Sequence, residues 1–236
     1  MEMLVLAGGF GKRLKKSLNN VPKPLAPIND TPLLKLLLKN WVSQGQQKFI
    51  FLLHHQAEKI IEFLSQQSNY FGNFVDIDWI VEKKPLGTGG SVSNAIRVKN
   101  LSGSVLISNA DTWLDGGLSK IKNIRSAAIA VVKVTDTRRF GSLSIDNEGN
   151  IFQFFEKNTN AFDNIPGMIN AGLYKLPTKI FLDFDEDKFS LEEKILPELS
   201  KKRSLKAVIL DGNFYDIGIP KDYSRFCEWY NEKVNL

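Results

Sequence analysis

The sequence lacks several features that define common classes of protein. Its single cysteine, Cys227, has no partner for a disulfide within the chain, so a reducing, cytoplasmic location is expected. No apolar run approaches the ~18 residues that span a bilayer, which excludes a membrane segment. The first residues contain no basic cluster, which argues against a secretory signal. The two histidines, His54 and His55, lack partners at ligand spacing, so no zinc site is expected.

The formal net charge is +5, and the lysines are scattered along the whole chain. A basic stripe interleaved with aromatic residues is missing, so nucleic acid is not an expected partner. The positive balance suits a phosphate-rich small ligand, although a solvated basic surface accounts for most of the lysines. Because no repeat, low-complexity tract or linker interrupts the sequence, we expect one domain over residues 1–236.

The first two thirds of the chain alternate between strand-like and helix-like segments. Thr31-Pro32 is a helix start signal, with Thr at the N-cap and Pro at the first helical position, and this helix should run to about Val42. Apolar runs predict strands at 3–7, 48–53, 75–81 and 104–108, and amphipathic runs predict further helices at 56–66 and 89–98. This repetition predicts a mainly parallel sheet with helices on both faces and ligands at the carboxyl ends of its strands.

The rest of the chain predicts further strands that complete the same α/β domain. Two strand-like runs flank Asp146-Asn-Glu-Gly149, which indicates a β-hairpin and therefore a mixed sheet. The predicted strands are 127–134, 142–145, 150–156, 171–176 and 205–210, and the predicted helices are 191–200 and 220–230.

A glycine-rich segment, Leu6-Ala-Gly-Gly-Phe-Gly-Lys-Arg13, directly follows the first predicted strand. Its glycines allow positive φ angles and bring backbone N–H groups close to an anion, beside two cationic side chains. A Walker P-loop fails here because residue 13 is Arg, and a Rossmann fingerprint fails because Leu14 stands where its third Gly belongs. A tight turn without a ligand is the structural alternative.

This segment resembles the signature of the sugar-1-phosphate nucleotidyltransferases, Leu-Ala-Gly-Gly-x-Gly-x-Arg-Leu followed by Pro-Lys-Pro, here Pro22-Lys23-Pro24. Every fixed position is present, although the family more often has Thr at position 12. The resemblance implies a Rossmann-like three-layer α/β/α fold with Arg13 and Lys23 as catalytic cations on the phosphates. Positioned cations stabilise the charge that builds on a pentavalent α-phosphate. The nucleotide-binding positions it implies here are Leu6, Ala7, Gly8, Gly9, Gly11 and Lys12.

A second marker, Glu82-Lys-Lys-Pro-Leu-Gly-Thr-Gly-Gly90, reads locally as a strand end, a turn and a helix N-terminus. By resemblance, Pro85, Gly87 and Thr88 contact the nucleobase and ribose. Guanine offers two adjacent donors, N1–H and N2–H₂, and the Glu82 carboxylate can accept from both. The segment looks most like that of the guanylyltransferases that act on mannose 1-phosphate or D-glycero-D-manno-heptose 1-phosphate.

Two carboxylates are candidate ligands for Mg²⁺. Asn109-Ala-Asp111 ends a predicted strand where the family has its Gly-Asp metal aspartate, and Asn109 is counted with the nucleotide contacts. Asp216, in Phe214-Tyr-Asp-Ile-Gly-Ile-Pro220, matches the family's second metal aspartate. Short carboxylates at strand ends suit a Mg²⁺ that bridges substrate phosphates. An Asx turn is the structural alternative for Asp111.

The sugar side of the site is implied by three short matches to the family. Phe140-Gly141, Phe155-Glu-Lys157 and Asn170-Ala-Gly172 correspond to positions that line its sugar pocket. The implied sugar-phosphate contacts are Gly141, Glu156, Lys157, Asn170 and Gly172. In isolation, Glu156-Lys157 reads as exposed charge at the end of a strand.

The resemblance implies that a sugar 1-phosphate attacks the α-phosphate of an NTP and releases pyrophosphate. GTP with D-glycero-α-D-manno-heptose 1-phosphate is the predicted pair, supplying a lipopolysaccharide or capsule. Mannose 1-phosphate with GTP, or a uridylyl, thymidylyl or cytidylyl transfer to another sugar 1-phosphate, stays open. A catalytically inactive nucleotide-sugar-binding subunit and a glycosyltransferase are rivals from other classes. The oligomeric state, a homo-oligomer included, is left open.

Overall fold

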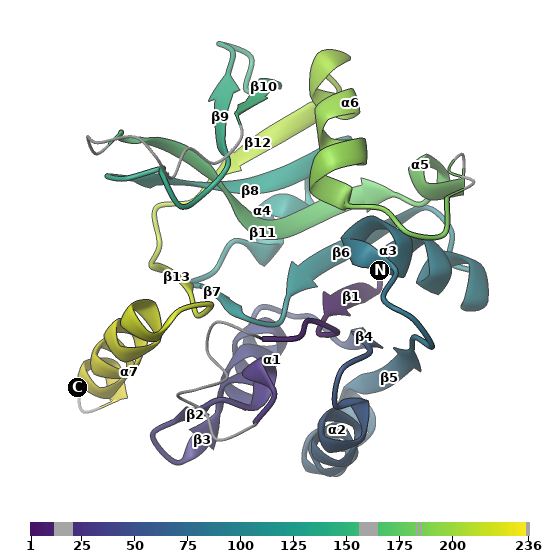
Figure 1. The fold of residues 1–236 in the computed structure, drawn as a ribbon, viewed down its shortest axis with the longest axis vertical. Coiled ribbons are helices and arrows are strands. Elements are labelled where there is room, and N and C mark those ends of the chain that lie inside the picture. The colour runs from purple at the N-terminus through teal and green to yellow at the C-terminus, as the bar shows by residue number, and fades with distance from the viewer. Residues whose placement is uncertain (12–20, 156–164, 183, 185, 235–236) are drawn as a thin grey trace. The chain divides into compact units, whose positions relative to one another are not determined.

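The chain forms an α/β fold with a mixed sheet flanked by helices (Figure 1). A computed structural model describes residues 1–11, 21–155, 165–182, 184 and 186–234. Contacts divide the chain into two compact units. The N-terminal unit comprises Glu2–Pro85, Ser108–Asp115 and Asn213–Leu236, and the central unit comprises Leu86–Ile107 and Gly116–Gly212 with Met1. The single domain expected over residues 1–236 stays a prediction.

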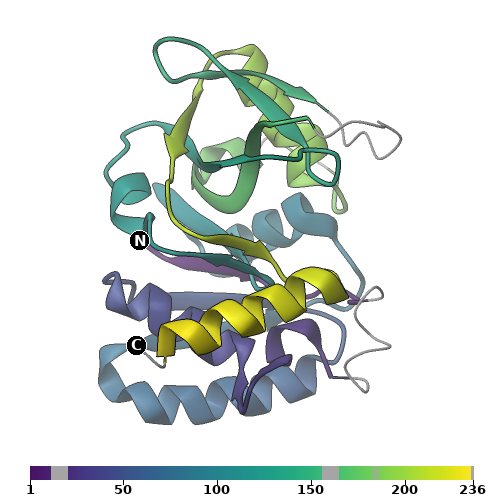
Figure 2. The same ribbon diagram turned by 90° about the vertical axis from the view of Figure 1, so that its left-hand side faces the viewer.

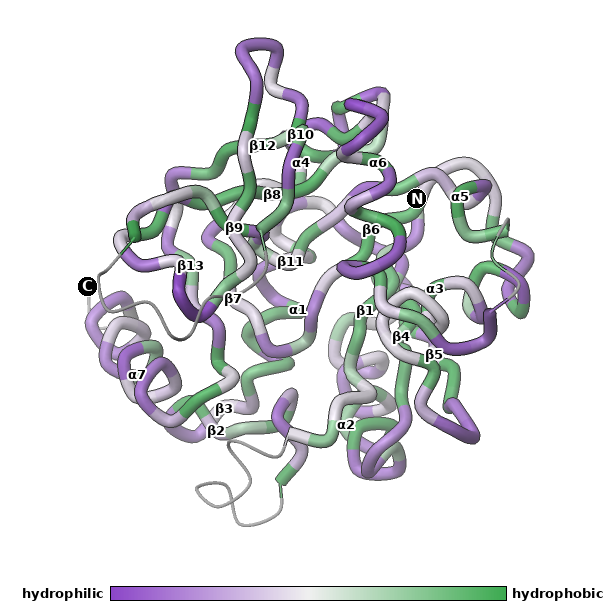
Figure 3. The backbone as a smooth tube through the Cα atoms, turned by 45° about the horizontal axis from the view of Figure 1, so that its top comes forward, coloured by the Kyte–Doolittle hydropathy of each residue, from purple (hydrophilic) through white to green (hydrophobic). Residues whose placement is uncertain are grey.

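Three parallel strands form the core of the N-terminal unit. They are β1 (Met3–Leu6), β4 (Lys48–Leu53) and β5 (Asp76–Val81), with β4 pairing with both of the others. The side chains of β1 and β4 are mostly buried, and Figure 3 colours both strands as hydrophobic, whereas the side chains of β5 are mostly half-buried or exposed. Two crossover helices, α1 (Leu33–Ser43) and α2 (Ala57–Phe71), connect them. Strand–helix–strand alternation was therefore the correct interpretation of this region.

The start of α1 corrects one detail of the sequence analysis. Thr31 is not the N-cap, because Thr31–Pro32 form the short strand β3, which pairs with β2 (Pro27–Ile28). Pro32 is the residue that precedes the helix, and the backbone N–H of Leu33 donates to the Ala26 carbonyl. A residue paired in a β-ladder and a helix N-cap need different backbone hydrogen bonds. In this chain Thr31 is paired with Ile28 in the ladder and therefore does not cap the helix. Helix α2 runs past its expected end at Gln66 and stops before Gly72, whose φ is +58°.

Two very short strands join distant parts of the sequence in the N-terminal unit. Strand β7 (Thr112–Leu114) pairs antiparallel with β13 (Phe214–Asp216). The last helix, α7 (Pro220–Val234, Figure 2), packs Phe226 against Trp113 of β7. Its Tyr223 hydroxyl donates to the carbonyl of Pro27. Two single turns, η1 (Lys23–Leu25) and η2 (Gly72–Phe74), complete this unit.

The central unit is built on the long strand β11 (Gly167–Pro177), which pairs antiparallel with β8 (Ala127–Val134) and β9 (Ser142–Ile145). Strand β12 (Leu205–Ile209) pairs parallel with β8, and β10 (Ile151–Phe155) pairs with β9. Strand β6 (Ser104–Asn109) begins in this unit. Its helices are α3 (Gly87–Val98), α4 (Leu118–Lys122), α5 (Lys179–Leu182), the π-helical turn η3 (Leu191–Ile195) and α6 (Leu196–Lys201).

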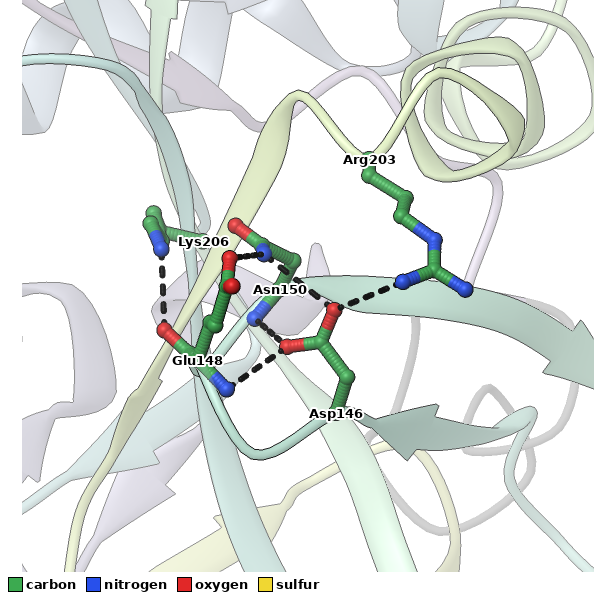
Figure 4. Close-up of polar contacts among 5 residues, drawn as sticks. All are labelled: Asp146, Glu148, Asn150, Arg203 and Lys206. Atoms are coloured by element: carbon green, nitrogen blue, oxygen red, sulfur yellow. Dashed lines mark hydrogen bonds and ion pairs between the residues drawn. The ribbon is translucent and has the colours of Figure 1, made fainter.

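The predicted hairpin between β9 and β10 is confirmed, and its turn is held by Asp146 (Figure 4). One carboxylate oxygen accepts the backbone N–H groups of Glu148 and Asn150, at 3.0 and 2.8 Å. Lys206 donates to the Glu148 carbonyl at 2.9 Å, which joins the turn to β12. Backbone hydrogen bonds to the Asp146 carboxylate lower its pKa.

Among the described residues, none of the helices combines the length and the apolar character that a bilayer crossing needs.

Candidate active site

The carboxyl ends of β1, β4 and β5 lie next to one another, as expected for parallel strands. The N–H of Ala7 donates to Leu52, and the N–H of Glu82 donates to Leu53. The ring Nδ1 of His54 lies 2.9 Å from the Glu82 carbonyl oxygen. A Cβ built on Gly8 would lie 3.2 Å from the Cβ of His54, so the glycine loop passes close to the end of β4. The predicted nucleotide contacts Leu6 to Gly8 and Glu82 therefore lie on either side of the end of β4, with His54 between them.

Lys23 is held in position by the chain on either side of it. Pro22 and Pro24 flank it in the 3-10 turn η1, where the N–H of Ala26 donates to the Lys23 carbonyl at 3.0 Å. Gly11 has a φ of +61°, and a Cβ on it would lie 3.1 Å from Cγ of Lys23. Glycine therefore lets the loop adopt this conformation against the lysine stem. The glycine loop and the Pro-Lys-Pro segment therefore pack against each other where Gly11 meets Lys23.

The Lys23 ammonium contacts one of the two predicted metal ligands. Its Nζ lies 3.1 Å from Oδ2 of Asp111, with the lysine side chain 14% exposed and the aspartate side chain 32% exposed. Asp111 is the second residue after β6, and the N–H of the first, Ala110, donates to the Leu6 carbonyl. A cation and a carboxylate thus meet beside the glycine loop.

The ladder of β7 and β13 brings Asp216 to the same place. Asp216 pairs with Thr112, and the N–H of Ile217 donates to the Asp111 carbonyl at 2.8 Å. The two aspartates, distant in sequence, are thus neighbours along the backbone, with Asp111 just before β7 and Asp216 at the end of β13. Mg²⁺ prefers oxygen ligands and takes one or two carboxylates together with substrate phosphates, so this donor set fits the ion. The residues that would hold it are Asp111 and Asp216.

Residues 87–90 have a packing role within the central unit. The N–H groups of Gly89 and Gly90 donate to the Phe189 carbonyl at 3.0 and 3.2 Å. A Cβ on Gly87 would lie 2.5 Å from that carbonyl oxygen, and the φ of Gly87 is +74°. The Thr88 hydroxyl donates to the Glu192 carboxylate at 2.6 Å. Glycine is therefore required at these positions because residues 187–191 approach too closely to leave room for a Cβ. This packing role holds independently of any nucleotide contact.

Gly90→Ala tests this packing. A Cβ on Gly90 would lie 2.3 Å from the Asp187 carbonyl oxygen, which is backbone and moves at a cost. Overpacking against a backbone atom this close should cost about 2–3 kcal/mol, the upper part of the usual range, and alanine regains about 1 kcal/mol of helix propensity. The free energy of unfolding should therefore fall by about 1–2 kcal/mol. Urea unfolding measures this change in the free energy of unfolding. The control is Val98→Ala on the same helix, 61% exposed, which should stay within about 0.5 kcal/mol. Equal stability of the Gly90 variant and the native chain would contradict the packing role.

The predicted sugar-side residues that the structure describes lie near one another in the central unit. Asn170 and Gly172 stand at an irregularity of β11, where the register to β8 shifts between Asn170 and Tyr174 and the φ of Gly172 is +73°. The register Ile169↔Ser142 brings Gly141, which precedes β9, to the same end of the strands. Gly141 also approaches the Phe155 carbonyl oxygen, 3.3 Å from a Cβ built on it.

Four predicted site residues lie outside the described residues: Lys12, Arg13, Glu156 and Lys157. The nucleotide and metal positions fall mainly in the N-terminal unit, and the sugar positions fall in the central unit.

Sequence reasoning missed two residues that the structure connects to the site. Glu192 contacts Thr88, and Tyr174 contacts Asn170 at 2.8 Å. In the sequence, Tyr174 looks like any other buried residue of a strand, so nothing marks it as a polar contact. Ser190-x-x-Glu193 is a helix-capping pattern, and Ser190 indeed accepts from the Glu193 N–H, but this pattern marks only the start of the turn.

Comparison with known proteins gives a matching family model and similar proteins from other organisms. A model of the Nucleotidyl transferase family matches residues 2–233. The D-glycero-alpha-D-manno-heptose 1-phosphate guanylyltransferase of Campylobacter jejuni is 37% identical, with 96% of this chain and 98% of that protein covered. The protein of the same description from Aneurinibacillus thermoaerophilus is 32% identical, with coverages of 95% and 96%.

Solved structures agree with the fold. HddC from Yersinia pseudotuberculosis, complexed with GMP-PN, has a TM-score of 0.83 at 35% identity and covers 97% of this chain and 99% of its own. UDP-glucose pyrophosphorylase complexed with UDP-glucose has a TM-score of 0.79 at 17% identity and covers 98% of this chain and 98% of its own. The latter supports the fold alone.

Proposed function

Because the chain belongs to the Nucleotidyl transferase family and is a sugar-1-phosphate nucleotidyltransferase, we propose that it uses GTP and D-glycero-α-D-manno-heptose 1-phosphate. The products would be GDP-heptose and pyrophosphate, and GDP-heptose would supply a bacterial surface glycan such as lipopolysaccharide or capsule. The observation that carries the reaction chemistry is the contact of Lys23 with Asp111 beside the glycine loop, with Asp216 on the adjacent strand.

The proposed chemistry uses this chain's cations and carboxylates. Phosphoryl-type transfer depends mainly on positioning and on stabilising charge at the phosphate oxygens. Lys23, held by its two prolines, would stabilise the charge on the α-phosphate, and Arg13 would add a second cation. Mg²⁺, when bound, would neutralise charge on the triphosphate oxygens. Asp111 and Asp216 would hold the ion and keep the triphosphate aligned for attack by the sugar phosphate. A sugar phosphate is already an anion at neutral pH, so no general base is invoked.

Guanine and the heptose are supported by the relatives and by Glu82. Two relatives that are matched over nearly their whole length are described as heptose 1-phosphate guanylyltransferases, and a third was solved with GMP-PN. Glu82 directly follows β5, and its carbonyl oxygen lies 2.9 Å from the ring of His54, the residue that the glycine loop approaches at Gly8. A carboxylate there can accept from two adjacent guanine donors.

The decisive experiment measures pyrophosphate release with four NTPs against a panel of sugar 1-phosphates. We expect the largest kcat/KM with GTP and the manno-configured heptose 1-phosphate. Mannose 1-phosphate as the better acceptor would move the assignment to a mannose-1-phosphate guanylyltransferase. Preference for UTP, dTTP or CTP would remove the guanine assignment. Release of a nucleoside diphosphate instead of pyrophosphate would indicate a glycosyltransferase.

Glu82→Gln tests the guanine contact. The amide replaces one acceptor oxygen with a donor that faces the guanine donors, so the preference for GTP over UTP should fall roughly 10- to 100-fold. The ratio of kcat/KM for the two nucleotides measures it. Glu58→Gln, an exposed glutamate in the first turn of α2, is the matched control and should keep the native ratio. An unchanged ratio in the Glu82 variant would remove Glu82 from base recognition.

A further inference from the structure

The ladder that carries Asp216 is very short. Strands β7 and β13 pair at three positions and form a two-stranded sheet of their own (Figure 1). A two-stranded ladder is marginally stable at best in water when nothing packs on it. The packing of another element must therefore supply the rest of its stability, and the last helix, α7, contacts both strands.

Phe226 of α7 makes this contact from a fully buried position. Its ring centroid lies 5.3 Å from that of Trp113 on β7 and 5.4 Å from that of Tyr215 on β13. Trp113 and Tyr215 are directly paired across the ladder, so one ring bridges a cross-strand pair. Aromatic pairs at such distances stabilise a structure beyond the area that they bury. Trp229, one turn later, lies 5.8 and 5.3 Å from the same two rings but is only half-buried.

The two faces of this ladder carry different side chains. Side chains alternate between the faces along a strand, and directly paired residues share a face. Trp113 and Tyr215 lie on the face that packs on α7, whereas Thr112 and Asp216, the next pair, lie on the opposite face. Asp216 is therefore adjacent to a residue that Phe226 holds, while its own carboxylate is turned away from the helix.

The same pairing connects Asp216 to Asp111. The N–H of Ile217 donates to the Asp111 carbonyl at 2.8 Å, one step beyond the pair of Asp216 with Thr112. On its other side, Asp111 contacts Lys23 at 3.1 Å. A shift of β13 along β7 would therefore move Asp216 while Asp111 stayed beside the lysine. Mg²⁺ demands near-ideal octahedral geometry, and ligands of a working site are held to within about 0.5 Å, so a small shift matters.

We propose that Phe226 is a positioning residue for the metal site. By packing on Trp113 and Tyr215 it holds β13 in register with β7, and it thereby fixes Asp216 relative to Asp111. This inference rests on the proposed function, in which the two aspartates hold Mg²⁺. Phe226 itself lies on the last helix, outside the motifs that indicate the reaction.

Phe226→Leu is the first test. Leucine keeps the position apolar but removes the ring that bridges the pair. The Mg²⁺ concentration for half-maximal pyrophosphate release should rise about tenfold, the lower end of what residues that orient metal ligands contribute. Turnover at saturating Mg²⁺ and the KM for the sugar 1-phosphate should stay within about twofold of the native values. If the leucine variant does not fold, Phe226→Met, whose flexible side chain fills gaps in a core, takes its place.

The matched control is Phe63→Leu. Phe63 is a buried phenylalanine on α2 of the same unit, so the same atoms are removed from another part of the core. Thermal unfolding should show a lower melting temperature for both variants, but only Phe226→Leu should need more Mg²⁺. An equal rise in the Mg²⁺ requirement of Phe63→Leu would overturn the proposal, because it would indicate a general loosening of the unit. An unchanged requirement in a folded Phe226 variant would also overturn it.

A double variant tests whether Phe226 acts through Asp216. Asp216→Asn removes the carboxylate that Phe226 is proposed to place, so adding Phe226→Leu should cause no further loss of turnover. Multiplied losses in the double variant would contradict action through Asp216.

A last measurement does not depend on turnover. Mn²⁺ added alone broadens the resonances of nuclei close to it, so it reports where the ion binds. The carboxyl ¹³C resonances of Asp111 and Asp216, assigned by their loss in the two Asp→Asn variants, should broaden together in the native protein and in Phe63→Leu. Phe226→Leu should need about tenfold more Mn²⁺ for the same broadening.

The outcomes of this measurement separate the two proposals. Broadening of only one aspartate in the native protein, or native-like broadening in Phe226→Leu, would overturn the positioning role. If the native enzyme failed with every sugar 1-phosphate but showed the expected broadening in each variant, the proposed function would be refuted and the role of Phe226 would stand.

Discussion

Asp111→Asn is expected to lower kcat by on the order of 10³-fold while the protein stays folded. An amide keeps the size of the side chain but loses the charge that a divalent ion needs. The Lys23–Asp111 pair is partly exposed, so its loss should cost at most about 1 kcal/mol of stability. The expected signature is therefore a large loss of turnover with a small change in Tm. Pyrophosphate release at several Mg²⁺ concentrations and a thermal melt measure the two quantities.

The matched control for this variant is Asp115→Asn. Asp115 lies just after β7 in the same unit and pairs with Lys233 at 2.9 Å, so it is a carboxylate in an ion pair without a predicted role in the site. Its variant should keep turnover within about twofold, since exposed ion pairs contribute little. Near-native, Mg²⁺-dependent turnover of Asp111→Asn would remove Asp111 from the site.

The elements that the sequence predicted well are those with a strong local pattern. Strands Lys48–Leu53 and Ala127–Val134 have the predicted bounds, because their apolar runs are long and end at polar residues. The Asp146 turn was also correct, since the side-chain contacts that form it lie within a few residues. Elements held by distant partners were missed, such as β7 and β13, which have three residues each. Their stability comes from pairing across the chain, which local propensity does not record.

The same distinction applies to the candidate site. The glycine loop, Lys23, Asp111 and Asp216 were predicted because each belongs to a compact motif, and the structure brings Lys23 and Asp111 together. That Asp216 would lie beside Asp111 required the family resemblance, since the two residues are 105 positions apart. The contact of Thr88 with Glu192 had no sequence signal, because the two residues are 104 positions apart on separate elements and meet only in the folded unit.

Lys23→Met is the second large effect that we expect, with kcat/KM lower by on the order of 10²- to 10³-fold. Methionine keeps an apolar stem to pack against Gly11 but removes the ammonium group. If Lys23 stabilises charge that develops on the α-phosphate, kcat should fall with kcat/KM, because the interaction is made in the transition state. Lys23→Arg should restore only part of the activity, since the planar guanidinium does not replace a compact ammonium in a turn set by two prolines.

The contact of Lys23 with Asp111 allows a second explanation, in which the lysine only orients the aspartate. The double variant Lys23→Met/Asp111→Asn separates the two. If Lys23 acts only through Asp111, the double variant should match Asp111→Asn, and if it acts on the phosphate, the double variant should be lower still. Lys48→Met is the control, because Lys48 is 59% exposed and pairs with Glu2 at 3.9 Å, and it should leave kcat/KM unchanged. We expect the lower value, since a lysine held between two prolines and packed on the glycine loop is placed for the phosphates that this loop would bind.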